Sequence, residues 1–333
     1  MVQSMTCTDT RDAKATVQQI RRLEEAGCEV VRVAVPDREA AGALSEIARR
    51  ITIPLIADIH FDYRLAIGAI ESGVAGIRIN PGNIAKEKIL KIVEAAKTRG
   101  TVIRIGINAG SLEKDLLRKY RRPSSSALVE SALRNLAILE EAGCNAIKLS
   151  VKASDVTTMV EAYRELSRKT DFPLHLGVTE AGTIVSASVK SAIGMGILLY
   201  EGIGDTIRVS VTGDPVSEIG VAYAILRAMD IRKVGPDIIS CPTCGRCEID
   251  LFRLTGEVED NLAGMKSHLK VALMGCVVNG PGEAAEADIG IAGGKGSGLL
   301  FKKGKVIRKV KEKEFVKTLL AEIDSMLANR KEI

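Results

Sequence analysis

The segment LEEAGCEVVRVAV at residues 23–35 returns as LEEAGCNAIKLSV at residues 139–151. Each copy has the pattern of a helix end, a glycine that terminates the helix, a cysteine, and a strand rich in β-branched residues. A helix that leads into a strand and recurs along the chain is the building unit of parallel α/β folds. The two copies therefore predict a repeated βα architecture, in which Cys28 and Cys144 are small apolar residues between helix and strand.

Eight short runs rich in β-branched residues occur along the chain, and most carry charged or amide side chains near their carboxyl ends. The runs are VQSM (2–5), CEVVRVAV (28–35), PLIADIHF (54–61), AGIRIN (75–80), TVIRIGIN (101–108), NAIKLSV (145–151), PLHLGVTE (173–180) and TIRVSV (206–211). Amphipathic stretches that often end on glycine separate them. Eight such units predict a closed (β/α)8 TIM barrel. The alternative is an open doubly wound sheet, which would need a G-x-G-x-x-G turn after the first strand, and SMTCTDT lacks it.

Composition excludes several classes of protein. Hydrophobic residues make up 46% of the 333 residues and charged residues 27%, as in folded globular proteins. The net charge of +5 and the aromatic content of 3% are low for a nucleic-acid binder. No apolar run has the roughly 20 residues of a membrane helix, and the first residues lack a signal-peptide pattern. We expect a cytoplasmic protein that binds neither nucleic acid nor membrane. The odd number of seven cysteines argues against a disulfide framework and for metal ligands or reactive thiols among them.

The carboxyl ends of the barrel strands form the mouth where active sites of this fold lie. Arginine and lysine outnumber the acids there, and a buried cation is costly unless an anion pairs with it. A guanidinium group can donate two parallel hydrogen bonds to phosphate oxygens, so the excess of arginine and lysine over acids predicts a phosphorylated substrate. The polar residues that we assign to the mouth are Arg32, Asp58, His60, Arg78, Asn80, Arg104, Asn108, Lys148, Lys152, Thr179, Glu180, Arg208 and Ser210.

The alternating pattern of strands and helices ends where Gly235 and Pro236 interrupt the last helical stretch. We assign the barrel domain to residues 1–232 and a second domain to residues 237–333. The second domain has the pattern of a small α+β domain, with a thiol-rich segment, a helix, two strands, a hairpin and a closing helix. Its basic stretch FKKGKVIRKVKEKEF (301–315) alternates apolar with cationic residues, which predicts an exposed edge strand followed by a helix.

The thiol-rich segment CPTCGRC (241–247) places three cysteines at every third position, and Cys276 follows in GCVVNGPGE (275–283). His268 and Glu283 are further candidate ligands. A zinc ribbon would need a second C-x-x-C, and a ferredoxin run would need another cysteine shortly after Cys247. Neither is present, so we favour an iron-sulfur cluster that is completed from residues 275–283.

The glycines of residues 275–283 fit a cluster platform. Gly275, Gly280 and Gly282 would let the backbone approach a bulky group, and Pro281 would begin a helix whose free N–H groups favour negative charge. Glu283 in that first helical turn could point at the metal or simply complement the helix dipole, and the pattern leaves both open.

The chain resembles the 4-hydroxy-3-methylbut-2-enyl diphosphate synthase family of the non-mevalonate isoprenoid pathway. The resemblance covers essentially the whole chain and rests on VQSMT, VRVAVP, IADIHF, GIRINPGNI, IRIGINAGSL, GVTEAG, SCPTCGR and GCVVNGPGE. It implies a reductive dehydroxylation, in which a cyclic diphosphate of methylerythritol is opened and loses an oxygen as water. It also implies a [4Fe-4S] cluster through which two electrons reach the substrate.

The resemblance assigns roles to single residues. It implies that Glu180 is the acid near the leaving hydroxyl, and that Cys241, Cys244, Cys276 and Glu283 are the cluster ligands. A carboxylate is a harder ligand to iron than a thiolate, so substrate oxygen could displace Glu283. The implied diphosphate contacts are Arg32, Arg78, Arg104, Lys148, Arg208 and Ser210, with Asp58, His60, Asn80, Asn108 and Thr179 around them.

The same resemblance implies partners. The substrate would be 2-C-methyl-D-erythritol 2,4-cyclodiphosphate, and the electron donor a flavodoxin or ferredoxin. The chain would form a homodimer in which the cluster domain of one chain covers the barrel of the other. Two features depart from the family pattern. Members usually carry a residue without a thiol where this chain has Cys247, so a cluster that uses Cys247 instead of Glu283 is an alternative. The chain also starts within the expected first strand, which suggests truncation or a misassigned start.

A rival interpretation is a phosphate-binding barrel without redox chemistry, joined to a structural zinc domain. It explains the arginines of the mouth but gives no role to Glu283 or to the glycines of residues 275–283. A binding-only electron-transfer scaffold is a further alternative, and it would never convert a cyclic diphosphate.

Overall fold

The computed structural model describes residues 1–60, 62–80, 84–276, 282 and 285–330. The chain divides into two compact units, Met1–Met229 and Asp230–Ile333, and each has its own hydrophobic core. Within the described ranges, no helix is both long and apolar enough to cross a membrane. We describe each unit by itself.

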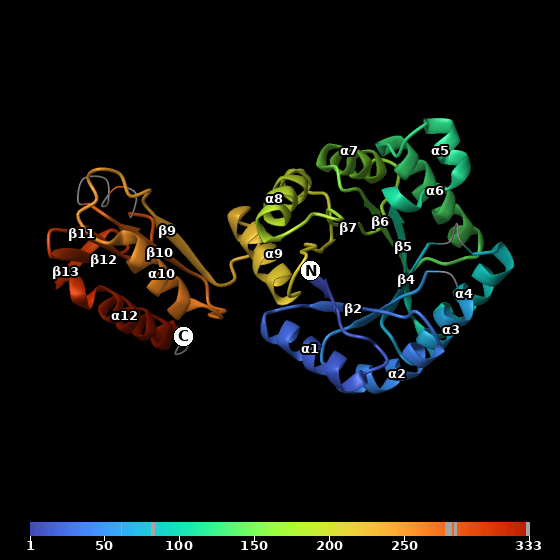
Figure 1. The fold of residues 1–333 in the computed structure, drawn as a ribbon, viewed down its shortest axis with the longest axis horizontal. Helices are drawn as coiled ribbons and strands as arrows, with labels where there is room; N and C mark the ends of the chain where they lie inside the picture. Colours follow the sequence, from blue (N-terminus) through green and yellow to red (C-terminus); the bar gives the residue numbers. More distant parts are fainter. Residues whose placement is uncertain (61, 81–83, 277–281, 283–284, 331–333) are drawn as a thin grey trace. The chain divides into compact units, whose positions relative to one another are not determined.

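The first unit is a barrel of eight parallel strands, so the (β/α)8 prediction is confirmed (Figure 1). The first six strands form one sheet in sequence order, and β7 pairs with β8. Single bridges from Leu149 to Leu174 and from Val2 to Ile207 join the two sheets and close the ring. The strands are β1 (Gln3–Met5), β2 (Val30–Ala34), β3 (Leu55–Asp58), β4 (Gly76–Ile79), β5 (Val102–Asn108), β6 (Ile147–Lys152), β7 (His175–Leu176) and β8 (Thr206–Ile207).

Helices surround this ring of strands, as Figure 1 shows. Asp12, Asp37 and Asp62 each accept a hydrogen bond from a first-turn backbone N–H, which fixes where three of the helices begin. Gly100 ends another helix with a left-handed φ of 68°, as the glycine pattern predicts. The helices are α1 (Ala13–Glu25), α2 (Arg38–Arg49), α3 (Tyr63–Glu71), α4 (Lys86–Arg99), α5 (Lys114–Tyr120), α6 (Ser125–Glu141), α7 (Val156–Ser167), α8 (Ile184–Tyr200) and α9 (Val216–Ala228).

Cys28 and Cys144 lie between helix and strand, as their position in the repeated segment predicts. Both are buried, at 4% and 2% exposure. Burial raises the pKa of the Cys28 thiol to about 11, although hydrogen bonds to the backbone oppose the shift. These two thiols are therefore unreactive parts of the core.

The second unit is a five-stranded sheet with helices packed on it. The strand order is β13-β12-β11-β10-β9, in which β9, β10 and β11 are parallel and β12 and β13 are antiparallel. The apolar faces of the two helices join the core of the sheet. The elements are β9 (Pro236–Ser240), α10 (Leu251–Leu262), β10 (Leu269–Met274), β11 (Ile289–Gly294), β12 (Ser297–Lys302), β13 (Lys305–Lys311) and α12 (Phe315–Arg330).

The two edges of this sheet differ in how well the sequence predicts them. The predicted exposed edge strand is confirmed as β13, in which every residue except Val310 is exposed. Strand β9 is not predicted from the sequence, because Gly235 and Pro236 have the pattern of a linker. Pro236 is the first residue of that edge strand, a position that needs no backbone donor.

Candidate functional site

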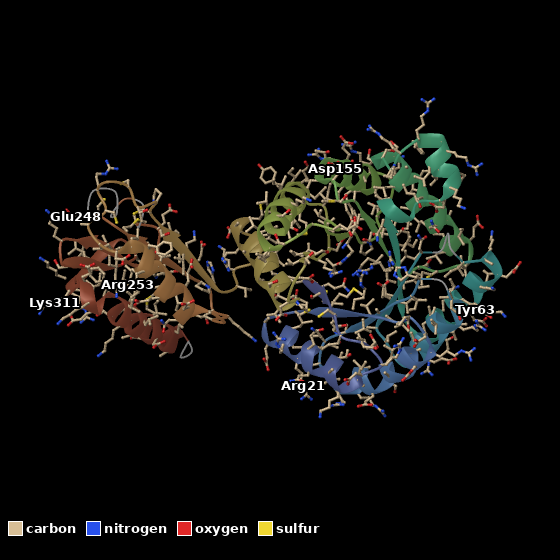
Figure 2. All side chains as sticks on the ribbon, viewed as in Figure 1. Arg21, Tyr63, Asp155, Glu248, Arg253 and Lys311 are labelled. Carbon is tan, nitrogen blue, oxygen red and sulfur yellow. The ribbon has the colours of Figure 1, made fainter. Side chains whose placement is uncertain are left out.

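A cavity of about 190 Å³ lies at the carboxyl ends of the barrel strands, and we call it the mouth cavity. Figure 2 shows blue side-chain nitrogen atoms gathered inside the ring of barrel strands. Nine of the eleven residues that the sequence suggested as substrate contacts line the cavity, and Lys152, Gly106 and Ser150 join them. The full lining is Arg32, Asp58, His60, Arg78, Arg104, Gly106, Asn108, Ser150, Lys152, Thr179, Arg208 and Ser210.

Asp58 is the acidic centre of one side of the mouth cavity. Its carboxylate accepts a hydrogen bond from Arg78 Nη1 at 3.2 Å and lies 3.6 Å from Arg32 Nε. Burial alone would raise the pKa of Asp58, but Arg32, His60 and Arg78 together lower it well below its ordinary value. Asp58 is therefore ionised and holds two guanidinium groups in place.

Arg78 is fixed by the backbone as well. Its Nη2 donates to the carbonyl of Gly106 at 2.9 Å. A Cβ on Gly106 would lie 2.2 Å from Arg78 Nε, so only glycine leaves room for this guanidinium. The glycine in TVIRIGIN therefore serves the site, a role that the sequence pattern did not reveal.

Arg208 is held by a carboxylate from behind the cavity. Glu218, which is 2% exposed and lies on α9, accepts from Arg208 Nη2 at 3.1 Å and from Nε at 3.3 Å. The same carboxylate accepts from Ser4 Oγ at 2.7 Å and from the Val211 backbone N–H at 3.2 Å. Glu218 is not predicted from the sequence, because an acid in a first helical turn usually only complements the helix dipole.

Two further cations have neutral hydrogen-bond partners. Arg104 Nη1 donates to the side-chain oxygen of Gln3 at 2.7 Å, and its buried Nε has no hydrogen-bond partner among the described residues. Lys152 Nζ lies 3.4 Å from Nε2 of His175, whose Nδ1 lies 2.8 Å from Thr206 Oγ1. Sequence reasoning also missed His175, which lies inside an apolar run on β7 and gives no pattern of its own.

The mouth cavity carries more buried positive charge than its carboxylates neutralise. Four arginines and Lys152 line it, whereas Asp58 lines it and Glu218 lies behind it. Burial lowers the pKa of Lys152 well below its ordinary value, and the nearby Arg208 and Arg104 lower it further. Burial and the neighbouring Arg32 have the same effect on the pKa of Arg104. An anion in the cavity would relieve this repulsion.

Lys148 does not lie at the mouth cavity, which corrects its assignment there. The sequence pattern predicts a sixth strand that ends at Val151, but β6 continues to Lys152. Lys148, Ser150 and Lys152 share one face of β6, and four residues of strand separate the first from the last by about 13 Å. Lys148 instead lines a second cavity of about 420 Å³, together with Arg104, Met1, Gln3, Val30, Pro54, Ile56, Ala75, Gly76, Ile77, Val102, Asn145, Ala146, Ile147, Pro173 and Thr206.

Asn80 and Glu180 lie next to the mouth cavity without lining it. Asn80 follows β4 and is buried, and its Oδ1 has no hydrogen-bond partner among the described residues. Glu180 follows the lining residue Thr179, is exposed, and has a left-handed φ of 51°. A residue other than glycine in this conformation costs about 1 kcal/mol, and such strain is often kept at functional sites.

The second unit brings backbone glycine close to two of its thiols. Cys241 Sγ accepts a hydrogen bond from the Gly275 N–H at 3.2 Å. A Cβ on Gly275 would lie 2.4 Å from Cys247 Sγ and 3.4 Å from Cys241 Sγ. Only glycine lets these two sulfur atoms approach the backbone so closely. The close approach and the N–H bond to Cys241 fit thiolates that are gathered to hold an iron-sulfur cluster.

The remaining candidate ligands differ in how much the structure says of them. Cys244 is exposed and Cys276 is half-buried. His268 Nδ1 lies 3.2 Å from the carbonyl oxygen of Gly235. Glu283, Gly280 and Pro281 lie outside the described residues. Within the described part of the chain, no three side chains of His, Cys, Asp or Glu are grouped to hold a metal ion.

Comparisons with known proteins agree with both units. The model of the GcpE TIM-barrel domain matches residues 1–223, and that of the GcpE protein C-terminal domain matches residues 237–325. A relative from Geobacter sulfurreducens, named 4-hydroxy-3-methylbut-2-en-1-yl diphosphate synthase (flavodoxin), is 58% identical over 330 residues, which are 99% of this chain and 94% of the relative. A relative of the same name from Caldanaerobacter subterraneus subsp. tengcongensis is 59% identical over 328 residues, which are 98% of this chain and 92% of the relative.

A solved structure shows the fold of the first unit. Dihydropteroate synthase from Stenotrophomonas maltophilia superposes with a TM-score of 0.50 at 16% identity, over 69% of this chain and 92% of that one. At this identity the likeness speaks for the fold alone. The two family models together match most of the chain, from the barrel to the sheet of the second unit, and the chain therefore belongs to the GcpE family.

Proposed function

We propose that this chain carries out the reaction for which its relatives are named, the formation of 4-hydroxy-3-methylbut-2-en-1-yl diphosphate. The substrate would be 2-C-methyl-D-erythritol 2,4-cyclodiphosphate, whose ring is opened and reduced with loss of a hydroxyl as water. The observation that carries the proposal is the unneutralised positive charge of the mouth cavity. A cyclic diphosphate is a compact anion with phosphate oxygens on two sides, which suits several arginine forks at once.

The substrate would be held mainly by charge-assisted hydrogen bonds. Arg78 and Arg32 are preoriented by Asp58, and Arg208 by Glu218, which supports their use as diphosphate clamps. Lys152 replaces Lys148 in this proposal, because only Lys152 lines the mouth cavity. The remaining contacts would come from His60, Asn80, Arg104, Asn108, Thr179 and Ser210.

Glu180 would supply the proton that turns the leaving hydroxyl into water. The overall step consumes two electrons and a proton for each substrate molecule, so a general acid close to the hydroxyl is required. Its strained backbone beside the lining residue Thr179 supports this role.

The electrons would reach the substrate through a [4Fe-4S] cluster, with Cys241, Cys244, Cys276 and Glu283 as its ligands. Thiolates are the ordinary ligands of such clusters, and the backbone N–H bond from Gly275 to the Cys241 sulfur supports Cys241 as one of them. The cluster would supply one-electron reduction at the substrate carbon, which none of the amino-acid side chains can perform.

Partners follow from the same proposal. A flavodoxin is the donor named for the relatives, and a ferredoxin could serve the same role. The seven free cysteines suit a reducing compartment, which supports the cytoplasm.

We further propose a homodimer in which the cluster domain of one chain covers the barrel mouth of the other and excludes water. The outer face of α8 supports a protein contact, because Val185, Val189, Ile193 and Ile197 are exposed at a spacing of four residues and Tyr200 follows them.

Anaerobic turnover tests the proposed reaction. Protein reconstituted with iron and sulfide is mixed with the cyclodiphosphate and a chemical reductant, and the linear diphosphate is detected by mass spectrometry. Arg78→Lys keeps the positive charge but loses the paired hydrogen bonds of the guanidinium, so turnover at limiting substrate should fall. The matched surface variant Arg21→Lys should turn over at the wild-type rate. Iron-loaded wild-type protein that makes no linear diphosphate would contradict the proposed reaction.

A further inference from the structure

Cys247 is a thiol that the proposed cluster leaves without a role. It is half-buried and packs against the core of the second unit, as does Cys241. Both sulfur atoms lie within 3.4 Å of the point where a Cβ on Gly275 would be. The sulfur atoms of Cys241 and Cys247 therefore lie against the same glycine and at most about 6 Å apart, with no side chain of residue 275 between them.

The local backbone holds the two thiols in this arrangement. Cys241 follows β9, and its N–H donates to the Leu273 carbonyl of β10 at 3.2 Å. The chain then turns back, since the Cys247 N–H donates to the Cys244 carbonyl at 2.9 Å. The Cys247 thiol donates to the Ile249 carbonyl at 3.2 Å, and the Cys241 sulfur accepts from the Gly275 N–H.

We propose that Cys241 and Cys247 form a disulfide when the chain lacks its cluster. A small-molecule disulfide such as oxidised glutathione is the oxidant. One protein thiolate attacks it to give a mixed disulfide and one glutathione thiol, and the second protein thiolate then displaces the other glutathione. The two cysteine sulfurs lose two electrons, the glutathione sulfurs gain them, and both thiol protons end on the two glutathione thiols.

The disulfide and the cluster exclude one another, because a ligand to iron must be a free thiolate. While the disulfide exists, Cys241 cannot be oxidised further to sulfinic or sulfonic acid, forms that are lost for cluster assembly. Reduction by a dithiol returns the free thiols and reopens the site. Cys247 thus acts as a resolving thiol for a cluster ligand, and this role depends on the geometry around Gly275 and not on the substrate.

Peptide mapping of the full-length, cluster-free protein tests the inference. Native protein is treated with oxidised glutathione under anaerobic conditions, remaining thiols are alkylated, and the protein is digested with trypsin without reduction. Cleavage after Arg246 separates the peptide 234–246, which holds Cys241 and Cys244, from the peptide 247–253, which holds Cys247. We expect these two peptides to be joined by a disulfide.

Single variants identify the partner of Cys247. In Cys244→Ser the joined peptides should persist, whereas in Cys241→Ser they should be lost. In Cys247→Ser, Cys241 should instead carry glutathione or pair with Cys244. Joined peptides that disappear in Cys244→Ser, or a wild-type protein that forms only the disulfide inside peptide 234–246, would overturn the inference. Circular dichroism of each variant verifies that the comparison is made on folded protein.

Discussion

Replacing Gly106 by alanine should displace Arg78 and weaken diphosphate binding. The added Cβ would lie 2.2 Å from Arg78 Nε and 3.0 Å from its Cζ and Nη2, far inside van der Waals contact. Three atoms of the guanidinium are affected at once and the side chain is buried, so the whole group must move. Its hydrogen bonds to Asp58 and to the Gly106 carbonyl cannot both survive this shift.

The size of the effect follows from the contact that is lost. A hydrogen bond to a charged group contributes about 1.5–3 kcal/mol, so the loss of one Arg78 contact to the diphosphate should weaken binding roughly 10- to 140-fold. Asp58 would keep its contact with Arg32, so the core beside it should remain folded.

Calorimetric titration of the cluster-free protein with the cyclodiphosphate measures this change. Gly68→Ala is the matched control, because a Cβ at Gly68 meets nothing within 4 Å and the residue lies inside α3. The control should bind like wild type and gain up to about 1 kcal/mol of unfolding free energy from helix propensity. If folded Gly106→Ala bound the substrate as tightly as wild type, the placement of Arg78 as a diphosphate contact would be wrong.

Three further predictions follow from single residues. Burial and neighbouring cations lower the pKa of Lys152, so a bound anion should raise this pKa again and substrate binding should take up a proton. Substrate affinity should then fall as pH rises above the pKa of Lys152 in the empty site. Calorimetric titrations in two buffers of different ionisation enthalpy should give different heats in wild type but equal heats in Lys152→Met. Glu180→Gln should retain substrate binding and iron but lose most turnover, and an active variant would remove Glu180 as the acid. Gly275→Ala should lose iron on reconstitution, because its Cβ would lie 2.4 Å from Cys247 Sγ and 3.4 Å from Sγ of the proposed ligand Cys241 and would displace these packed thiols. Gly256→Ala, whose Cβ would meet nothing within 4 Å, should keep its iron, and iron analysis of both variants decides.

The sequence predicts the barrel and most of the mouth cavity for a physical reason. Side chains alternate along a strand, so residues at even spacing near a strand end share the inner face of a closed barrel. Arg78 and Arg104 are neighbours in the register of β4 and β5, and Asp58 is the neighbour of Arg78 on β3. Local patterns and the closure of the barrel therefore suffice to bring these three together.

The misassignment of Lys148 and the missed residues share a cause, which is that local sequence does not encode depth along the barrel. Lys148 and Lys152 are both inward-facing lysines of one strand, and only the observed extent of β6 separates their levels. Glu218 reaches Arg208 from a helix ten residues later in the chain, and His175 is a polar residue within a buried run. Neither contact leaves a periodic signal in the sequence.

Binding of the cyclodiphosphate to cluster-free wild-type protein, measured by calorimetry at increasing salt and repeated on Arg78→Lys, is the most direct test of a diphosphate site in the barrel mouth. We predict binding that needs no cluster, weakens as salt screens the cationic cavity, and weakens again in Arg78→Lys. Binding that appears only after the cluster is installed, or that is equal in wild type and Arg78→Lys, would contradict the assignment of the anion site to this cavity.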